Sequence, residues 1–299
     1  MDLHHEKDAI KDGHRFGGFW TKKKLEMLRK YLNAYVIALK KQRFRTVYID
    51  AFAGTGEIFT QDCDDDDECL LYLESDFAHD EVPIAGSARH ALETSPAFDE
   101  YIFIEKKKDH VEQLKRLCSE YPGCNTTVIM GDANQVLVDV CDKLGTYDRA
   151  VLFLDPYGMS VDWTTLQKLA KKKVIDIWFL FNISAISRLI PRSGDPYCNS
   201  AVLNRVYGDD SWKVFFVCHD DQLSLFADQE HVQRECSPEK IKEYTLKRMR
   251  SIFPAVHPKP KVFYNKRNSP MFLFFFVMTN PSDKAKKVAF SIANGILTS

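Results

Sequence analysis

The sequence predicts an α/β fold with a doubly wound, mostly parallel sheet, and three observations support this prediction. Short apolar strands alternate with amphipathic helices between residues 46 and 183. The first strand, in V-Y-I-D-A-F-A-G-T-G (47–56), runs directly into a glycine-rich turn. Near the C-terminus, Lys261–Asn265 and Met271–Thr279 flank a turn sequence and indicate an antiparallel hairpin.

The composition is that of a folded globular protein with a sizeable core, with 45% hydrophobic and 28% charged residues in a chain of 299. The longest apolar run, Met271–Met278, is shorter than the roughly 20 residues that a membrane span needs. The N-terminus lacks the apolar segment of a signal peptide. The eight cysteines form no C-x-x-C pair, which is typical of reduced thiols. We therefore expect a cytoplasmic protein with no metal site and no membrane partner.

The charge is balanced overall but unevenly distributed. A formal net charge of −1 gives no global reason to expect nucleic-acid binding. The acidic run Asp62–Glu68 lacks the glycine and glutamate positions of a calcium-binding EF-hand loop, so we interpret it as a solvated surface loop. The basic clusters are more typical of solvated helix ends than of a binding site; they are Lys22–Lys24, Lys40–Arg45, Lys106–Lys108 and Lys171–Lys173.

Residues 1–45 are expected to form an N-terminal arm and a helix. Residues 1–12 carry no regular pattern, whereas apolar residues from Leu25 to Leu39 recur at helical spacing. Thr21 is the predicted N-cap, and the helix is expected to end at about Lys41. The glycines and aromatic residues before Thr21 suit either a loop folded over a flat ligand or an arm packed on the core.

Residues 46–183 form the predicted core, interrupted at 57–83 by an acidic surface insertion with little periodicity. After the insertion, helices and strands alternate. The predicted helices are Gly86–Ala97, His110–Tyr121, Gln135–Leu144 and Thr164–Lys173, and the predicted strands are Tyr101–Glu105, Thr126–Met130, Ala150–Leu154 and Ile175–Phe181.

Residues 184–257 are interpreted as a helical insertion, and residues 258–299 as the hairpin and a final helix that complete the core. Proline and glycine divide the insertion into helices near Ala185–Ile190, Asn199–Tyr207 and Pro238–Ile252. Ser282 is expected to cap the last helix, which would run to Asn294.

Four successive predicted strands end in a polar or glycine-rich group. These groups are Asp50 with its glycine loop, Glu105, Asp132–Ala133, and D-P-Y-G beginning at Asp155. Because the carboxyl ends of parallel strands meet at one edge of a sheet, the pattern predicts a ligand site there.

A nucleoside with a charged tail fits these groups better than a nicotinamide cofactor does. The loop lacks G-x-G-x-x-G, and no predicted helix follows it directly. Glu105 can accept hydrogen bonds from both ribose hydroxyls, and Asp132 from an adenine amino group. The glycine loop, with Ala53, Gly54 and Gly56, would pack under an amino-acid tail.

Residues 46–183 and the terminal hairpin resemble the Rossmann-like S-adenosylmethionine-dependent methyltransferases. The resemblance implies a seven-stranded sheet and S-adenosylmethionine as the cofactor. D-P-Y-G resembles the D-P-P-Y and D-P-F-G tetrapeptides of enzymes that methylate exocyclic amines of nucleic-acid bases. This implies that Asp155 and the Pro156 carbonyl hold the amine while Tyr157 stacks on the base. G-G-F-W-T-K-K-K is similar to a glycine-lysine motif that contacts the cofactor's methionine end, which assigns Trp20 and Lys24 to that role.

A more specific resemblance, to the three-Cys-motif partner protein family, covers nearly the whole chain. It rests on F-G-G-F-W-T-K-K-K-L-E-M-L, Y-I-D-A-F-A-G-T-G, G-D-A-N, and F-L-D-P-Y-G-M followed by W-x-x-L. The family name implies a partner protein with a cysteine motif. We therefore expect a methyltransferase acting on an exocyclic amine of RNA or DNA. The alternatives are a non-catalytic, cofactor-binding partner subunit and a methyltransferase of a protein or small molecule.

Overall fold

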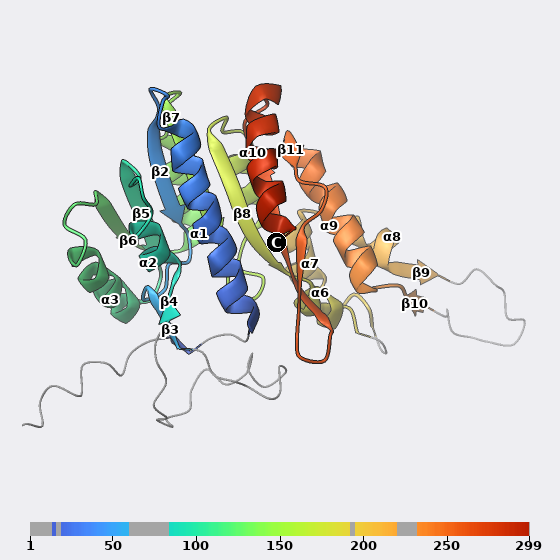
Figure 1. Cartoon of the computed structure of the whole chain (residues 1–299). Coiled ribbons are helices and arrows are strands. Elements are labelled where there is room, and N and C mark those ends of the chain that lie inside the picture. Colours follow the sequence, from blue (N-terminus) through green and yellow to red (C-terminus); the bar gives the residue numbers. More distant parts are fainter. Residues whose placement is uncertain (1–13, 16–18, 60–83, 192–194, 220–231, 299) are drawn as a thin grey trace, which may run out of the picture. The chain divides into compact units, whose positions relative to one another are not determined.

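The computed structural model describes residues 14–15, 19–59, 84–191, 195–219 and 232–298 (Figure 1). They fall into two compact units. The first contains the residues up to Ala133 together with Tyr147–Leu152, and the second contains Asn134–Thr146 together with the chain from Phe153 onward. The expected acidic run and residues 1–12 lie outside the described residues.

Parallel strands form the sheet of the first unit. Its elements are β1 (His14–Arg15), α1 (Phe19–Leu39), β2 (Arg45–Asp50), β3 (Glu57–Phe59), β4 (Ile84–Ala85), α2 (Ser87–Leu92), β5 (Glu100–Glu105), α3 (Lys108–Ser119) and β6 (Thr126–Met130). Strand β5 pairs in parallel with β2 on one side and with β6 on the other, so that Ile102 lies opposite Ile49 and Thr127. These pairings place the ends of β2, β5 and β6 at one edge.

The core of this unit contains apolar residues from the helix and the strands. The predicted face of α1 is buried, with Leu28 and Leu32 inaccessible to solvent. In the strands, Tyr48, Tyr101 and Phe103 are also fully buried, and their ring centroids lie 6.2–6.5 Å apart. Aromatic packing of this kind fixes the strand register because each ring fills a specific space.

Three sequence predictions for this unit need correction. Helix α1 begins at Phe19, so Thr21 is a buried residue of the first helical turn and not the N-cap. Helix α2 ends at Leu92 and not near Ala97, because the residue before Pro96 is disfavoured in helical geometry. The segment before α1 and the start of the insertion also contain strands: β1 pairs in parallel with β3, which pairs with β4.

The second unit combines helices with an antiparallel set of strands. Its elements are α4 (Ala133–Asp142), α5 (Trp163–Ala170), β8 (Ile175–Asn182), α6 (Ile183–Leu189), α7 (Ser200–Tyr207), α8 (Trp212–Phe216), β9 (Val217–His219), β10 (Val232–Arg234), α9 (Pro238–Ile252), β11 (Ala255–Val256), β12 (Lys261–Tyr264), β13 (Pro270–Met278) and α10 (Asp283–Leu297). Strand β13 is antiparallel to both β8 and β12, which confirms the predicted C-terminal hairpin. Ser282 caps α10 by accepting a hydrogen bond from the Ala285 amide, also as predicted.

The strands form one mixed sheet in the order β11-β13-β8-β7-β2-β5-β6, with β12 paired to β13. Strand β7 (Asp148–Leu154) contributes residues to both units. The sheet is mostly parallel and ends in the antiparallel hairpin, as predicted for the fold class, and the two-residue strand β11 adds an eighth strand to the expected seven. The predicted helical insertion contains the expected helices and also a short hairpin of β9 and β10, which the sequence did not indicate.

No helix in the described ranges is long and apolar enough to cross a membrane. Within those ranges, no group of three or more His, Cys, Asp and Glu side chains is arranged to hold a metal ion. The described cysteines are free thiols, and Cys118, Cys141 and Cys236 are buried. Burial raises the pKa of Cys141 to about 12, so this thiol is protonated at neutral pH.

Candidate functional site

The glycine loop begins where β2 ends, and Asp50 fixes its first turn. The Asp50 carboxylate is inaccessible to solvent. It accepts hydrogen bonds from the Phe52 amide at 3.2 Å and from the Tyr48 hydroxyl at 3.1 Å. These contacts hold the strand-to-loop corner, and a direct contact of Asp50 with a cofactor stays a prediction.

Glycine is required at two positions of the loop. Gly54 has φ +61° and Gly56 has φ +85°, in the left-handed region that other residues rarely adopt. A Cβ atom at Gly56 would lie 2.2 Å from Cδ2 of Leu117 in α3. The Ala53 amide donates a hydrogen bond to the Ile104 carbonyl at 3.0 Å, which extends the pairing of β2 with β5 into the loop. The loop backbone is therefore packed tightly against β5 and α3.

Glu105, the last residue of β5, is the buried acid next to this loop. Only 6% of its surface is exposed. Oε2 accepts a hydrogen bond of 3.0 Å from the Gly54 amide, and Oε1 accepts bonds of 2.8 Å from the amides of Lys106 and Lys107. Each carboxylate oxygen has two lone pairs, so the group retains acceptor capacity for a ligand hydroxyl.

His110 in α3 lies beside this carboxylate, with Nδ1 3.4 Å from Glu105 Oε1. Desolvation lowers the pKa of His110, an effect that the charge of Glu105 opposes. The imidazole is therefore neutral at pH 7 and can donate a hydrogen bond to Glu105 without neutralising its charge.

Asp132 and Ala133 follow β6 at the same edge. Glu105 pairs with Met130 in the β5–β6 ladder, and the Gly131 amide donates to the Glu105 carbonyl at 3.0 Å. Asp132 Oδ2 forms an ion pair of 3.1 Å with the Lys106 ammonium, and Ala133 is buried. Within the first unit, the structure thus gathers the glycine loop, Glu105 and Asp132, as the sequence predicted.

Trp20 and Lys24 lie one helical turn apart at the start of α1. The Lys24 ammonium is 5.0 Å from the centroid of the Trp20 ring, and Lys24 is 5% exposed. A buried lysine over an aromatic ring gains a cation–π interaction that partly offsets its desolvation. Their contact with the methionine end of a cofactor stays a prediction.

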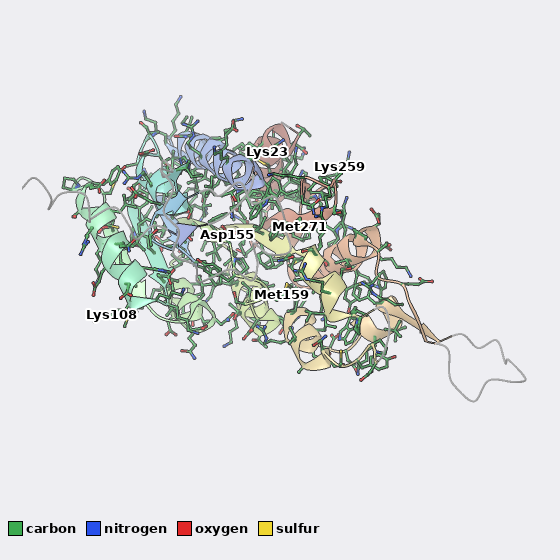
Figure 2. All side chains as sticks on the ribbon, turned by 90° about the horizontal axis from the view of Figure 1, so that it is seen from below. Lys23, Lys108, Asp155, Met159, Lys259 and Met271 are labelled. Carbon is green, nitrogen blue, oxygen red and sulfur yellow. The ribbon has the colours of Figure 1, made fainter. Side chains whose placement is uncertain are left out.

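The D-P-Y-G loop belongs to the second unit and follows the last residue of β7. Asp155 and Pro156 are half-buried, whereas the Tyr157 side chain is 46% exposed. Gly158 has φ +56°, and a Cβ at this position would meet no atom within 4 Å. Figure 2 labels Asp155 and Met159, which stand just before and after Pro156–Gly158.

Asn134 at the start of α4 holds the chain that follows this loop. Its Nδ2 donates to the Ser160 carbonyl at 2.8 Å. Its Oδ1 accepts bonds from the Asp162 amide at 2.9 Å and from the Thr165 hydroxyl at 3.0 Å. One side chain thereby fixes the path between D-P-Y-G and helix α5.

A small, mostly apolar cavity of about 10 Å³ lies under the D-P-Y-G loop. It is lined by Pro156, Gly158, Met159, Val161, Trp163, Leu166, Phe179, Leu180, Phe181, Asn182, Val206, Tyr207, Thr245 and Met249. A space of this size holds about one water molecule. A nucleobase therefore does not fit inside, whereas the Tyr157 side chain beside the cavity is exposed.

Sequence reasoning missed three residues of these sites: His110, Asn134 and Asn182. Asn134 ends the G-D-A-N motif, but its role depends on a loop 26 residues away. Asn182 ends β8 and caps α6 by accepting a bond from the Ala185 amide at 2.9 Å, and an asparagine directly before a helix is a recognisable cap signal. The position of His110 beside Glu105 had no signal in the sequence.

No family model matches the chain, and no curated protein matches its sequence. Among solved structures, a protein of family DUF519 from Legionella pneumophila is 12% identical, with 90% of each chain covered and a TM-score of 0.47. The N-terminal domain of EvdMO1, in the presence of SAH (S-adenosylhomocysteine) and D-fucose, is 10% identical over 85% of this chain and 82% of that one, with a TM-score of 0.39. The same domain with SAH bound gives 11% identity over 84% and 80% of the two chains, with a TM-score of 0.37. All three TM-scores lie below 0.5, so the function of this chain has to be argued from its own residues.

Proposed function

We propose that the protein is an S-adenosylmethionine-dependent methyltransferase acting on an exocyclic amine of a nucleic-acid base. The observation that carries the proposal is the buried Glu105 carboxylate, bonded to the Gly54 amide at 3.0 Å. The remaining lone pair on Oε2 provides an acceptor for a ribose hydroxyl next to glycine-loop backbone that a ligand can approach closely. Asp132, two residues beyond the end of β6, would accept from the adenine amino group.

S-adenosylmethionine would supply an activated methyl group, and the protein residues would hold the two reactants. Methyl transfer to an amine depends mainly on alignment, so positioning supplies most of the acceleration. In this proposal Asp155 and the Pro156 carbonyl orient the amine, and Tyr157 stacks on the base. A base within a duplex would have to be flipped out, whereas an unpaired base would not.

Calorimetry with S-adenosylhomocysteine tests the cofactor part of the proposal. We expect the wild-type protein to bind, and Glu105→Ala to bind more weakly by about 1–3 kcal/mol because a ribose hydroxyl would lose its acceptor. Unchanged affinity of Glu105→Ala would contradict the assignment of this residue.

Tritium transfer from labelled S-adenosylmethionine into cellular RNA and DNA tests the catalytic part. Asp155→Ala should abolish transfer and leave S-adenosylhomocysteine affinity within a few-fold, because Asp155 is assigned to the acceptor and not to the cofactor. Tyr157→Ala should weaken acceptor binding by about 1–3 kcal/mol, the usual contribution of one base stack, and Tyr157→Phe should have little effect.

A non-catalytic, cofactor-binding partner subunit is the second candidate, with a three-Cys-motif protein as its partner. The observation that favours it is the cavity under D-P-Y-G, which has room for one water and not for an acceptor. Tight binding of S-adenosylhomocysteine without labelling of RNA or DNA, even in cell extract, would support this candidate. Labelling of a protein or a small molecule instead would change only the acceptor.

A further inference from the structure

The turn of the β12–β13 hairpin projects beyond the carboxyl end of β8. Phe272 of β13 lies opposite Asn182, the last residue of β8, while Phe263 of β12 lies opposite Phe272. The next pair, Tyr264 with Pro270, and the turn between them are therefore past the end of β8. Figure 1 shows this projection as the long loop between the two strands.

The turn has a defined conformation that is held by Asn265. The Asn265 side chain accepts hydrogen bonds from the amides of Arg267 at 3.1 Å and Ser269 at 2.7 Å. Its backbone amide donates to the Ser269 carbonyl at 2.9 Å, and its carbonyl accepts from the Asn268 amide at 3.0 Å. Asn268 has φ +57°, which asparagine tolerates better than most residues. These bonds fix the backbone from which Lys266 and Arg267 extend.

The hairpin itself is basic near its turn. Residues 261–270, from the start of β12 to the first residue of β13, contain three cations and no acidic residue. At the turn, Lys266 and Arg267 are exposed, and 50% of the adjoining Tyr264 side chain is exposed while its neighbour Phe263 is buried. An exposed aromatic ring beside two cations combines a stacking surface with phosphate-binding groups.

This turn and the D-P-Y-G loop lie at the same end of the second unit. Asn182 pairs with Phe272 of the hairpin, and it also lines the cavity that Pro156 and Gly158 line. Figure 2 views the molecule from the side toward which the hairpin turn projects in Figure 1, and it labels Asp155 and Met271.

We propose that Tyr264, Lys266 and Arg267 form a binding site for single-stranded nucleic acid. Lys266 and Arg267 contact successive phosphates, and an unpaired base stacks on Tyr264. This inference rests on the proposed function, because the strand held here is the one that offers its base to D-P-Y-G. A single strand is the partner because its bases are free to stack, whereas the bases of a duplex are already stacked on one another.

Fluorescence anisotropy with labelled 12-nucleotide single-stranded RNA, single-stranded DNA and duplex DNA tests the site in the full chain, without cofactor. Lys266→Ala/Arg267→Ala should reduce the magnitude of the slope of log K against log salt by about 1.4, since each phosphate contact in a single strand contributes about 0.7. Tyr264→Ala should weaken binding roughly 5- to 150-fold with an unchanged slope, because it removes a stacking contact and no charge. Tyr264→Phe should bind like the wild type.

The matched control is Lys284→Ala/Lys287→Ala, which removes the same charge from exposed positions at the start of α10. Helix α10 follows the last residue of β13, which pairs near the start of β8, at the other end of the sheet. The control variant should retain the wild-type slope to within about 0.5, less than one phosphate contact. Equal losses in the two double variants would overturn the site, and so would tighter binding to duplex than to either single strand.

Three further outcomes separate this site from the alternatives. If polyglutamate of equal charge competes as well as the oligonucleotides do, the turn is a general anion or acidic-protein surface and the proposal is wrong. If S-adenosylhomocysteine fails to bind while the hairpin variants lose oligonucleotide binding as described, the methyltransferase proposal fails and the nucleic-acid site stands. If the protein binds S-adenosylhomocysteine but no oligonucleotide, the nucleic-acid site at the turn is wrong and the cofactor part of the methyltransferase proposal stands. The RNA and DNA arms identify which strand the site prefers.

Discussion

The Gly54 amide donates a hydrogen bond to the Glu105 carboxylate, joining two residues 51 positions apart in the chain. The bond links the loop after β2 to the end of β5, two strands that pair in parallel. The carboxylate also accepts from the amides of Lys106 and Lys107, so its orientation is set before any ligand arrives. A ribose hydroxyl that binds here meets an acceptor already in place, which lowers the entropic cost of binding.

Glu105 should therefore contribute to stability as well as to cofactor affinity. Glu105→Ala leaves three backbone amides without their acceptor and should lower the free energy of unfolding by about 1–3 kcal/mol in urea titrations. Glu105→Gln is the control, because its carbonyl replaces one acceptor and the side chain keeps its size. We expect Glu105→Gln to lose less stability than Glu105→Ala. Equal stability of wild type and Glu105→Ala would show that the three amides form hydrogen bonds with water in the variant.

Gly56→Ala should destabilise the protein by about 1–3 kcal/mol, through backbone strain and overpacking. The residue has φ +85°, and an added Cβ would lie 2.2 Å from Leu117. Gly295→Ala is the matched control because its Cβ would meet no atom within 4 Å in α10, and it should stabilise by about 0.5–1 kcal/mol. Thermal unfolding of both variants measures the difference, and a shift of the same sign in both would contradict this reading of the glycine loop.

Asn134→Ala should impair methyl transfer more than cofactor binding. The change removes the bonds that hold Ser160, Asp162 and Thr165 and should cost about 1–3 kcal/mol of stability. S-adenosylhomocysteine affinity should stay within a few-fold, because Asn134 fixes the chain after D-P-Y-G. Asn134→Asp keeps the two acceptor contacts and should lie between wild type and Asn134→Ala. Parallel calorimetry and tritium-transfer assays compare the two effects.

His90 should make the protein less stable in mild acid. Burial lowers its pKa, Arg29 lowers it further and Glu93 opposes the shift; among the described residues, Nδ1 is buried without a hydrogen-bond partner. Above the unfolded-state pKa of about 6.5, His90 is neutral in both the folded and the unfolded state, and it causes no loss of stability. As the pH falls below that value, the unfolded state gains a proton before the folded state does. The free energy of unfolding then falls by up to about 1.4 kcal/mol per pH unit.

Urea titrations at pH 7.5 and 5.5 measure this dependence, with His90→Gln as the test variant. We expect a smaller loss of stability in acid for His90→Gln than for the wild type. Part of the loss should remain, because desolvation also lowers the pKa of His110. An identical pH dependence in both proteins would exclude His90 as a source.

The long apolar helices and strands could be predicted because their apolar residues recur with the period of a helix or a strand, which indicates the buried face. Strand β6 has the predicted bounds, and β5, β7 and β8 differ from the prediction by one or two residues. The elements that the sequence did not predict depend on pairing between segments far apart in the chain. The two-residue strand β1 exists because it pairs with β3, more than 40 residues later, and so short a segment has no pattern of its own.

The common position of Gly54, Glu105 and Asp132 at one sheet edge could be predicted for a similar reason, while their contact with a cofactor stays a prediction. An acid or glycine at the end of a parallel strand is brought to a common edge by the topology, as Gly54, Glu105 and Asp132 are. Local hydrogen bonding could not be foreseen in the same way. The ion pair of Asp132 with Lys106 and the contact of His110 with Glu105 depend on side-chain directions that follow from the folded backbone.

Strands β3 and β4 pair antiparallel, with Glu57 opposite Ala85 and Ile58 opposite Ile84, on either side of residues 60–83. Two ladder rungs thus bring the ends of the intervening segment together next to the glycine loop, whatever that segment contains. Replacing its 24 residues with a four-residue turn would lower the loop-closure cost by about 1.5 kcal/mol. Because β3 and β4 hold the two ends of this segment together, a reporter domain or an affinity tag could be inserted between them. The insertion would leave the backbone of Gly54 and Gly56 undisturbed.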